Sequence, residues 1–298
     1  MQPSLVTAVF LPLALGIIML GLGLGLTPAD FKRVLVYPKA VAVGLLCQMV
    51  LLPLLCFGLV KALALPGELA VGLMLLAASP GGATANLYSH LAKGDVALNI
   101  TLTAVNSVLS MVTLPIIVNL SLAALAGTST VIGLQADKVV QVFAVVLVPV
   151  GIGMAVRARA PALAARLGKP MKIASAAFLF VIIVGAVLKD RQTLADNFAS
   201  GGTAALLFNL TSLAVGYVVP RVARLSKRQS VAIGMEIGIH NGTLAIAIAT
   251  GLLHSPAMAI PPAIYSLIMF FTAAAFGAWV SRGAEAAPEP AAAMPAQS

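Results

Sequence analysis

The chain has 298 residues, of which 60% are hydrophobic and only 9% are charged, with a mean hydropathy of +1.05. Because a soluble domain carries about 25% charged residues, this composition excludes a water-facing globular protein. The charge balance is basic, with 18 Lys and Arg against 9 Asp and Glu. The basic residues lie between apolar runs, with no patch of interleaved aromatic residues, which excludes a nucleic-acid-binding surface. We therefore expect an all-α polytopic membrane protein.

Nine apolar stretches are long enough to cross a bilayer core of about 30 Å. They cover residues 4–26, 40–62, 68–92, 96–126, 138–157, 171–189, 201–223, 229–253 and 257–281. The first stretch has neither the basic flank nor the cleavage site of a signal peptide and is expected to stay in the mature protein. The fourth contains Pro115 and is expected to be kinked or divided. The Ala/Pro/Glu-rich end, residues 283–298, is expected to be a disordered cytoplasmic tail.

Polar, glycine-containing segments interrupt the third and eighth stretches, at Ser79–Asn86 and Glu236–Thr243. The two breaks lie five helices apart, as matching positions in two inverted repeats would, with one peripheral helix missing. Within one transmembrane domain, 1–282, we expect repeat one at about 1–126 and repeat two at about 138–282. Breaks free backbone carbonyls and amides, which membrane proteins tolerate only inside protein or beside a water-filled cavity. The two breaks are therefore expected to form a binding site.

Glu236 is the one acidic residue that lies well inside an apolar stretch. An ionisable group at that depth costs several kcal/mol unless it is paired, protonated or hydrated. A cation or proton site is therefore favoured over a protonated carboxyl group bonded to a backbone carbonyl. In the fourth stretch four polar residues share one helical face, either as contacts between helices or as sodium ligands: Asn99, Thr103, Asn106 and Ser107. Without nucleotide or zinc motifs, the expected energy source is an ion gradient.

Taken together, these segments resemble the bile acid:sodium symporter family. The resemblance runs from the first stretch to the ninth. Its most specific points are Pro80-Gly-Gly-x-x-x-Asn86, Lys93-Gly-Asp-Val-Ala-Leu and Glu236-x-Gly-x-x-Asn241. It implies a core domain, in which discontinuous helices 3 and 8 cross at their breaks, beside a smaller panel domain. It also implies a secondary transporter that uses sodium as its coupling ion, not an enzyme, with no other cofactor.

The resemblance also implies site residues. One sodium site would use Asn86, Thr103 and Glu236, with Ala85 and Asn99 where relatives often have serine. The other would use Gln48, Glu236 and the carbonyls of Ile237 and Ile239, with His240 where relatives often have glutamine. The organic anion would meet the ends of the half-helices, at Ala83, Thr84, Asn86, Asn209, Asn241 and Gly242.

The expected function is sodium-coupled symport of an organic anion into the cell, the anion being bile acid-like, pantoate-like or another small carboxylate or sulfonate. A proton-coupled or uncoupled carrier on the same fold is an alternative. For His240, whose side chain has a reference pKa of about 6.5, the hypothesis is that its protonated form replaces the second sodium. The alternative is that His240 only hydrogen-bonds across helices 3 and 8 while its carbonyl binds sodium. A distant alternative is an intramembrane enzyme that uses Glu236 and His240, four residues apart on one helical face, as an acid–base pair. The expected partners are the anion, sodium and the lipid bilayer, and no obligate protein partner is evident.

The distribution of basic residues predicts the orientation of the chain. The loops after helices 1, 3, 5 and 7, together with the tail, hold 14 of the 18 Lys and Arg, and the opposite side holds 4. Because basic loops stay in the cytoplasm, we expect a multi-pass protein of the inner (plasma) membrane with its N-terminus outside and its C-terminus cytoplasmic. Alkaline phosphatase fused to the C-terminus should then be inactive. A fusion that is active in the periplasm would overturn the helix count or the orientation.

Overall fold

The computed structural model describes residues 11–27, 29, 32–82, 84–125, 136–168, 170–171, 173 and 191–282. Over these residues the regular structure is helical, apart from one isolated β-bridge. Most of the stretch expected at 171–189, and the whole tail expected at 283–298, lie outside the described residues. Within them, four helices are long and apolar enough to cross a membrane, as expected of a membrane protein: Pro38–Ala62, Val96–Leu125, Ala199–Val222 and Ala257–Ser281.

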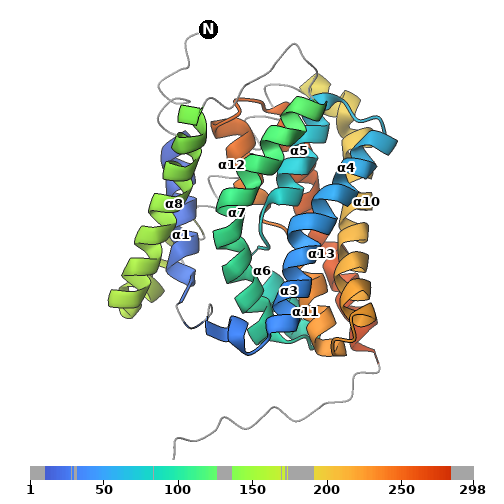
Figure 1. Cartoon of the computed structure of the whole chain (residues 1–298). Helices are drawn as coiled ribbons and strands as arrows, with labels where there is room; N and C mark the ends of the chain where they lie inside the picture. The colour runs from blue at the N-terminus through green and yellow to red at the C-terminus, as the bar shows by residue number, and fades with distance from the viewer. Residues whose placement is uncertain are drawn as a thin grey trace, which may run out of the picture.

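The helices that the structure describes lie at or near the apolar stretches predicted from the sequence (Figure 1). The first half comprises α1 (Leu11–Gly25), η2 (Arg33–Leu35), α3 (Pro38–Leu46), the π-helix η3 (Cys47–Leu51), α4 (Leu52–Ala62), α5 (Gly67–Ala78), α6 (Thr84–Leu91) and α7 (Val96–Leu125). The second half comprises α8 (Ala136–Arg159), α10 (Arg191–Val222), α11 (Lys227–Gly238), α12 (Gly242–Gly251), η5 (Ala257–Ala259) and α13 (Ile260–Ser281). The fourth stretch was expected to be kinked or divided at Pro115. The division is wrong, because α7 runs through Pro115 as one helix of 30 residues, and the kink stays a prediction.

The two expected breaks are present. The first separates α5 from α6 after Ala78, where Pro80 cannot continue the helical hydrogen bonds. The second was expected to begin at Glu236, but α11 continues to Gly238 and α12 begins at Gly242. No proline stands at this position, and the amide of Ile239 still donates to the carbonyl of Met235 at 3.1 Å. Glu236 therefore lies in the last turn of an intact half-helix.

The breaks cross and pair with each other at the centre of the molecule. The amide of Gly82 donates to the carbonyl of Ile239 at 2.7 Å, and the amide of Asn241 donates to the carbonyl of Pro80 at 2.8 Å. Figure 1 shows α5 and α12 in the upper half of the bundle and α6 and α11 in the lower half. Every residue in Leu69–Ala78 and in Ser230–Gly238 is buried. The crossing is therefore enclosed by protein and satisfies part of its own backbone.

The turn that precedes α5 has the same geometry as the turn that precedes α11. Ala64 and Arg224 both have a positive φ, of 48° and 60°. The amide of Leu65 donates to the carbonyl of Val60, and the amide of Leu225 donates to the carbonyl of Pro220. The matching residues are all 160 positions apart (224 minus 64, 225 minus 65, 220 minus 60), and α5 and α11 have 12 residues each.

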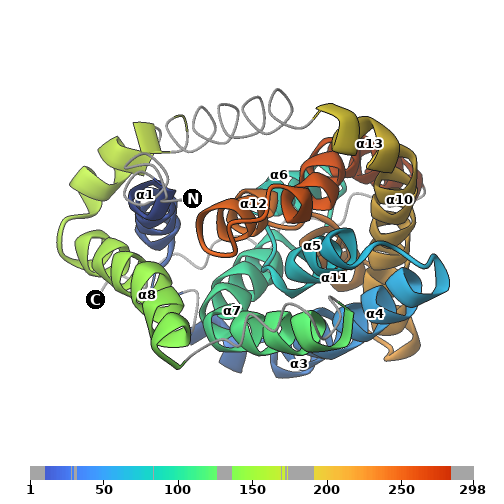
Figure 2. The same cartoon turned by 90° about the horizontal axis from the view of Figure 1, so that it is seen from above.

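α1 and α8 pack closely against each other through glycines. A Cβ atom at Gly23 would lie 2.2 Å from the carbonyl oxygen of Val150, and one at Gly153 would lie 2.5 Å from that of Leu20. The two backbones can approach only because these side chains are absent. Seen from above, the pair lies at one side of the molecule, away from α4 and α10 (Figure 2).

Gly72 provides a test of the core packing, because a Cβ at this position would lie 2.2 Å from the carbonyl oxygen of Met258. We expect Gly72→Ala to push η5 away from α5 and to destabilise the protein by about 1–3 kcal/mol. The matched control is Gly58→Ala in α4, where a Cβ would meet no atom within 4 Å. Melting temperatures in detergent measure the difference, and equal values for the two variants would contradict the packing.

Candidate functional site

The carboxylate of Glu236 is fully buried beneath the crossing and accepts three hydrogen bonds. Thr103 Oγ1 donates to Oε2 at 2.6 Å, and Asn106 Nδ2 donates to Oε1 at 3.2 Å. The third donor is the backbone amide of Gly81, in the opposite break. Donors from two elements besides its own helix, α7 and the first break, therefore hold the carboxylate in place.

The crossing depends on glycine where Glu236 meets the first break. A Cβ at Gly81 would lie 2.3 Å from Glu236 Oε1 and 2.7 Å from Oε2. A side chain of any size there would displace the carboxylate, so glycine allows the backbone of one break to touch the acid of the other.

Four buried amide oxygens around the crossing have no hydrogen-bond partner: Gln48 Oε1, Asn86 Oδ1, Asn99 Oδ1 and Asn106 Oδ1. In three of these side chains the amide nitrogen is already engaged as a donor. Asn99 Nδ2 donates to the carbonyl of Ala232 at 2.6 Å, Asn106 donates to Glu236, and Gln48 donates to the carbonyls of Ala77 and Ser79. A buried unpaired acceptor is costly, and a cation supplies the missing partner. Carboxylate and amide oxygens suit a hard cation such as sodium, so these residues fit one.

Two predicted residues of the second cation site, Gln48 and His240, meet at the carbonyl of Ser79 in the first break. Gln48 lies in the π-helix η3 and donates to the carbonyl of Ser79 at 2.9 Å. His240 Nδ1 lies 3.2 Å from the same carbonyl. Ile237 is buried in α11, and the carbonyl of Ile239 accepts the hydrogen bond from Gly82. Gln48 and the second break are therefore joined through Ser79.

The His240 ring packs against two aromatic rings. Its ring stacks on Phe208 at 5.7 Å between centroids, and the Tyr265 ring lies 5.4 Å away at a tilt of 60°. Because Nδ1 faces a carbonyl, that nitrogen carries a proton, while Nε2 is buried without a partner. The protonation of both nitrogens, considered above, stays a prediction.

The predicted anion-binding residues are divided between helix ends and the interior. Thr84 and Gly242 begin α6 and α12, whose N-termini carry partial positive charge. Asn241 uses its side-chain oxygen to cap α12 through the amide of Leu244. Ala83 lies outside the described residues.

Asn209 was also expected to contact the anion. Its side chain is fully buried and donates to the carbonyl of Gly238 at 3.0 Å, while Thr272 donates to its oxygen. Asn209 therefore supports the end of α11, and its contact with an anion stays a prediction.

Three contacts at the site were not among the predicted ones. Asn106 had a signal in the sequence, because it follows Thr103 by three residues on the same helical face. The amide of Gly81 and the hydroxyl of Tyr265, which donates to the carbonyl of Gly238 at 3.0 Å, had none. Both contacts depend on how distant helices cross.

Two crossed half-helix pairs around a buried carboxylate and unpaired oxygens define a membrane transporter. Residues 12–197 match the sequence profile of the Sodium Bile acid symporter family, and the chain belongs to this family. The uncharacterized sodium-dependent transporter YocS of Bacillus subtilis is 30% identical over 267 residues, which are 89% of this chain and 81% of that protein. The probable chloroplastic sodium/metabolite cotransporter BASS2 of Oryza sativa subsp. japonica is 28% identical over 289 residues, 95% of this chain and 67% of the relative.

The probable chloroplastic sodium/metabolite cotransporter BASS1 of Arabidopsis thaliana is 28% identical over 270 residues, 90% of this chain and 66% of the relative. These relatives are transporters named for sodium rather than enzymes. The family predicted from the sequence is therefore confirmed, and so is the prediction that the chain is not an enzyme.

Gly81→Ala tests the contact between the breaks. We expect the new methyl group to displace the Glu236 carboxylate, so that sodium chloride no longer raises the melting temperature of the purified protein. The control is Gly82→Ala in the same break, where the nearest atom would lie 3.3 Å from the new Cβ, and its response to sodium should survive. If both variants respond to sodium as the wild type does, the contact is not required.

Proposed function

We propose that the protein is a secondary active transporter that brings an organic anion into the cell together with sodium. The observation that carries the proposal is the group of unpaired buried oxygens around Glu236. Neutral amides bonded through nitrogen, with their oxygens left free beside a carboxylate, suit cation binding. The match to the Sodium Bile acid symporter family supports sodium as that cation.

Two sodium positions share the Glu236 carboxylate in this proposal. The first uses the carboxylate, the hydroxyl of Thr103 and the amide oxygens of Asn86 and Asn99, to which we add Asn106. The second uses the carboxylate with four residues of the crossing: Gln48, Ile237, Ile239 and His240. Their support is the unpaired state of the amide oxygens and the link that Ser79 makes between Gln48 and His240.

In this proposal, the charges of Glu236, the bound sodium ions and the helix ends make anion binding depend on sodium binding. Glu236 supplies one negative charge, so two sodium ions leave the crossing with one net positive charge. The N-termini of α6 and α12 add roughly half an elementary charge each. A carboxylate or sulfonate at these helix ends is therefore attracted when sodium is bound and is opposed by Glu236 when sodium is absent. The proposed contacts are Ala83, Thr84, Asn86, Asn209, Asn241 and Gly242.

Residues beside the proposed anion position favour a substrate with an apolar body. Phe270 and the ring of Tyr88, both partly buried, stack at 6.1 Å between α13 and α6. A bile acid-like anion suits these aromatic groups better than a small pantoate-like one.

The proposal includes nine transmembrane helices in two inverted repeats. The turns repeated at 160 positions support it, and so do contacts at the two ends of the bundle. The amide of Asp95 donates to the carbonyl of Arg228 at 3.0 Å, and Ser255 Oγ donates to Glu68 at 2.8 Å. Both partners are related by the same shift (255 minus 95, 228 minus 68). α1 and α8 would belong to the panel domain, and the crossing helices to the core domain.

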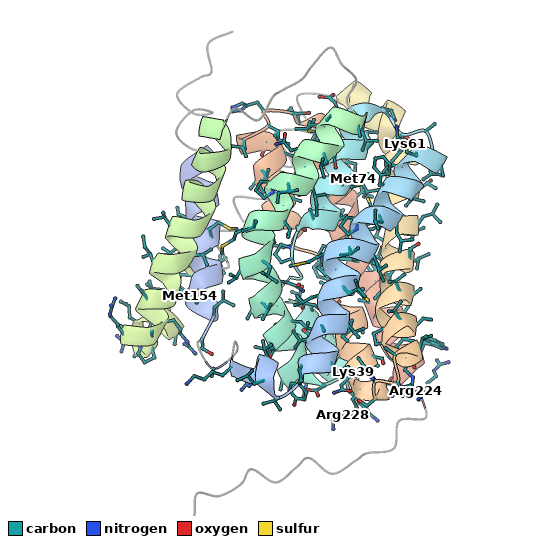
Figure 3. The ribbon with its side chains drawn as sticks, viewed as in Figure 1. Lys39, Lys61, Met74, Met154, Arg224 and Arg228 are labelled. Carbon is teal, nitrogen blue, oxygen red and sulfur yellow. The ribbon has the colours of Figure 1, made fainter. Side chains whose placement is uncertain are left out.

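The orientation in the proposal places the N-terminus outside and the C-terminus in the cytoplasm. Lys39, Arg224 and Arg228 lie at one end of the bundle, and Lys61 lies near the other (Figure 3). The basic end is the cytoplasmic one under the rule that basic loops stay inside.

Glu236→Gln tests the shared negative charge. We expect the variant to fold, because an amide fits the same space, but to lose both sodium-dependent uptake of taurocholate and pantoate in proteoliposomes and stabilisation by sodium. For the wild type, sodium at 100 times its dissociation constant should stabilise the folded state by about 2.7 kcal/mol. The control is Glu68→Gln, an exposed carboxylate outside the site. Wild-type behaviour of Glu236→Gln would refute the proposal, and uptake driven by a pH gradient alone would favour the proton-coupled carrier.

A further inference from the structure

The chain between α1 and α3 forms a short connector at the basic end of the molecule, and Figure 1 shows it running from the lower end of α1 to the lower end of α3. Its 3₁₀ helix η2 covers Arg33–Leu35, and the amides of Val36 and Tyr37 both donate to the carbonyl of Arg33, at 2.9 and 3.2 Å. The next residue begins the apolar helix Pro38–Ala62, which is long enough to cross a membrane. The connector, residues 32–37, therefore lies at the boundary of the bilayer.

One side of the connector packs against the protein. Val34 and Tyr37 are three residues apart, which places them on one side of a 3₁₀ turn. They contact a cluster of buried residues: Ala40, Val41, Leu98, Leu102, Leu225, Ala232 and Ile233. The Asp95 carboxylate is close to Tyr37, because burial and then this carboxylate raise the pKa of Tyr37 above its ordinary value, while Arg33 and Arg228 lower it. The inner side thus holds the connector to the core.

The other side of the connector carries an exposed apolar pair. Leu35 is 85% exposed, the highest value among the large hydrophobic residues that the structure describes, and Val36 is 67% exposed. Packing within the protein does not account for this pair, because Val34 and Tyr37 already occupy the inner side. Leaving the pair in water costs free energy in proportion to its apolar area, so a partner that covers it is expected.

Basic side chains flank the apolar pair. Lys32 precedes Leu35 by three residues and Lys39 follows Val36 by three, and both lysine side chains are exposed. No acidic residue occurs between positions 32 and 39. Figure 3 shows Lys39 at the same end of the molecule as Arg228. Apolar side chains between lysines at a membrane boundary are typical of segments that lie in the interface and attract anionic lipids.

We propose that the connector is a binding site for anionic phospholipid in the leaflet at the basic end of the molecule. Leu35 and Val36 insert among the acyl chains next to the headgroups, and the ammonium groups of Lys32 and Lys39 bind the phosphates. A free phosphate ion would neutralise the lysines but leave the apolar pair in water, whereas a phospholipid meets both needs. The site goes beyond the proposed transport function, because it requires neither sodium nor the organic anion.

Tryptophan fluorescence tests the site in vesicles. The single native Trp is removed by Trp279→Phe, and Leu35→Trp is introduced. The vesicles contain phosphatidylglycerol and phosphatidylcholine in equal parts, and one or the other is brominated on the acyl chain near the headgroup. We expect brominated phosphatidylglycerol to quench position 35 about twice as strongly as brominated phosphatidylcholine, because each basic residue near the surface favours anionic lipid. Adding Lys32→Gln and Lys39→Gln should keep the quenching and remove the preference.

The control for position 35 is Phe271→Trp in the same background, at a residue of α13 that is 78% exposed. Both lipids should quench this position equally, because no basic residue lies within ten positions of it on α13. A position 35 that neither lipid quenches would show that another part of the protein covers the connector. Equal quenching of position 35 by both lipids would show that the lysines select no headgroup. Either result overturns the proposal.

A second measurement follows the melting temperature of the purified protein in detergent. Phosphatidylglycerol should raise it more than phosphatidylcholine does, and potassium phosphate should not raise it. The variant with Lys32→Gln and Lys39→Gln should lose this difference, whereas Lys61→Gln, near the other end of the molecule (Figure 3), should keep it. Phosphate that stabilises the protein as much as the lipid does would replace the lipid site by a simple anion site. No readout uses sodium, so these results stand apart from the test of the proposed function.

Discussion

The pairing of two helix breaks, amide to carbonyl, is the contact on which the rest of the molecule depends. Gly82 with Ile239 and Asn241 with Pro80 satisfy backbone groups that would otherwise be unpaired at the centre of the bundle. In a membrane no water is available to replace them. The crossing therefore forms only when both breaks are present, and it brings Gly81 so close to Glu236 that a Cβ at Gly81 would lie 2.3 Å from Oε1.

Around this crossing, the nitrogen and the oxygen of the same amide side chain have different roles. Asn99, Asn106 and Gln48 each use nitrogen to brace a neighbouring helix and leave oxygen unpaired. The same residue thus contributes to folding through one atom and, in the proposed function, to cation binding through the other. This arrangement explains why the polar stripe on α7 admitted two interpretations, contacts between helices or cation ligands. In the structure the two roles are not exclusive.

Several parts of the site were predictable because few alternatives exist for them in an apolar segment. At membrane depth, the carboxylate of Glu236 needs a hydrogen-bonding or ionic partner, and the Pro-Gly-Gly sequence at Pro80 leaves backbone groups that need partners. Both were therefore predicted from the sequence to lie at a binding site. The start of the second break could not be predicted, because nothing in the sequence forbids α11 from continuing two residues beyond the acid to Gly238. The support of Gly238 by Asn209 and Tyr265 depends on crossing angles that periodicity does not encode.

Three hydrogen bonds join α7 and the residue before it to α11 at a constant interval of 133 positions, and they restrict how the chain can change length: Asp95 with Arg228, Asn99 with Ala232 and Thr103 with Glu236. An insertion or deletion of one residue between Asp95 and Thr103, or between Arg228 and Glu236, rotates everything beyond it by about 100°. Such a change moves Thr103 away from Glu236 as surely as substituting either residue. Segments of the chain outside Asp95–Thr103 and Arg228–Glu236 face no such restriction from these contacts. Length variation among natural or engineered versions of this chain therefore belongs outside these two helical segments.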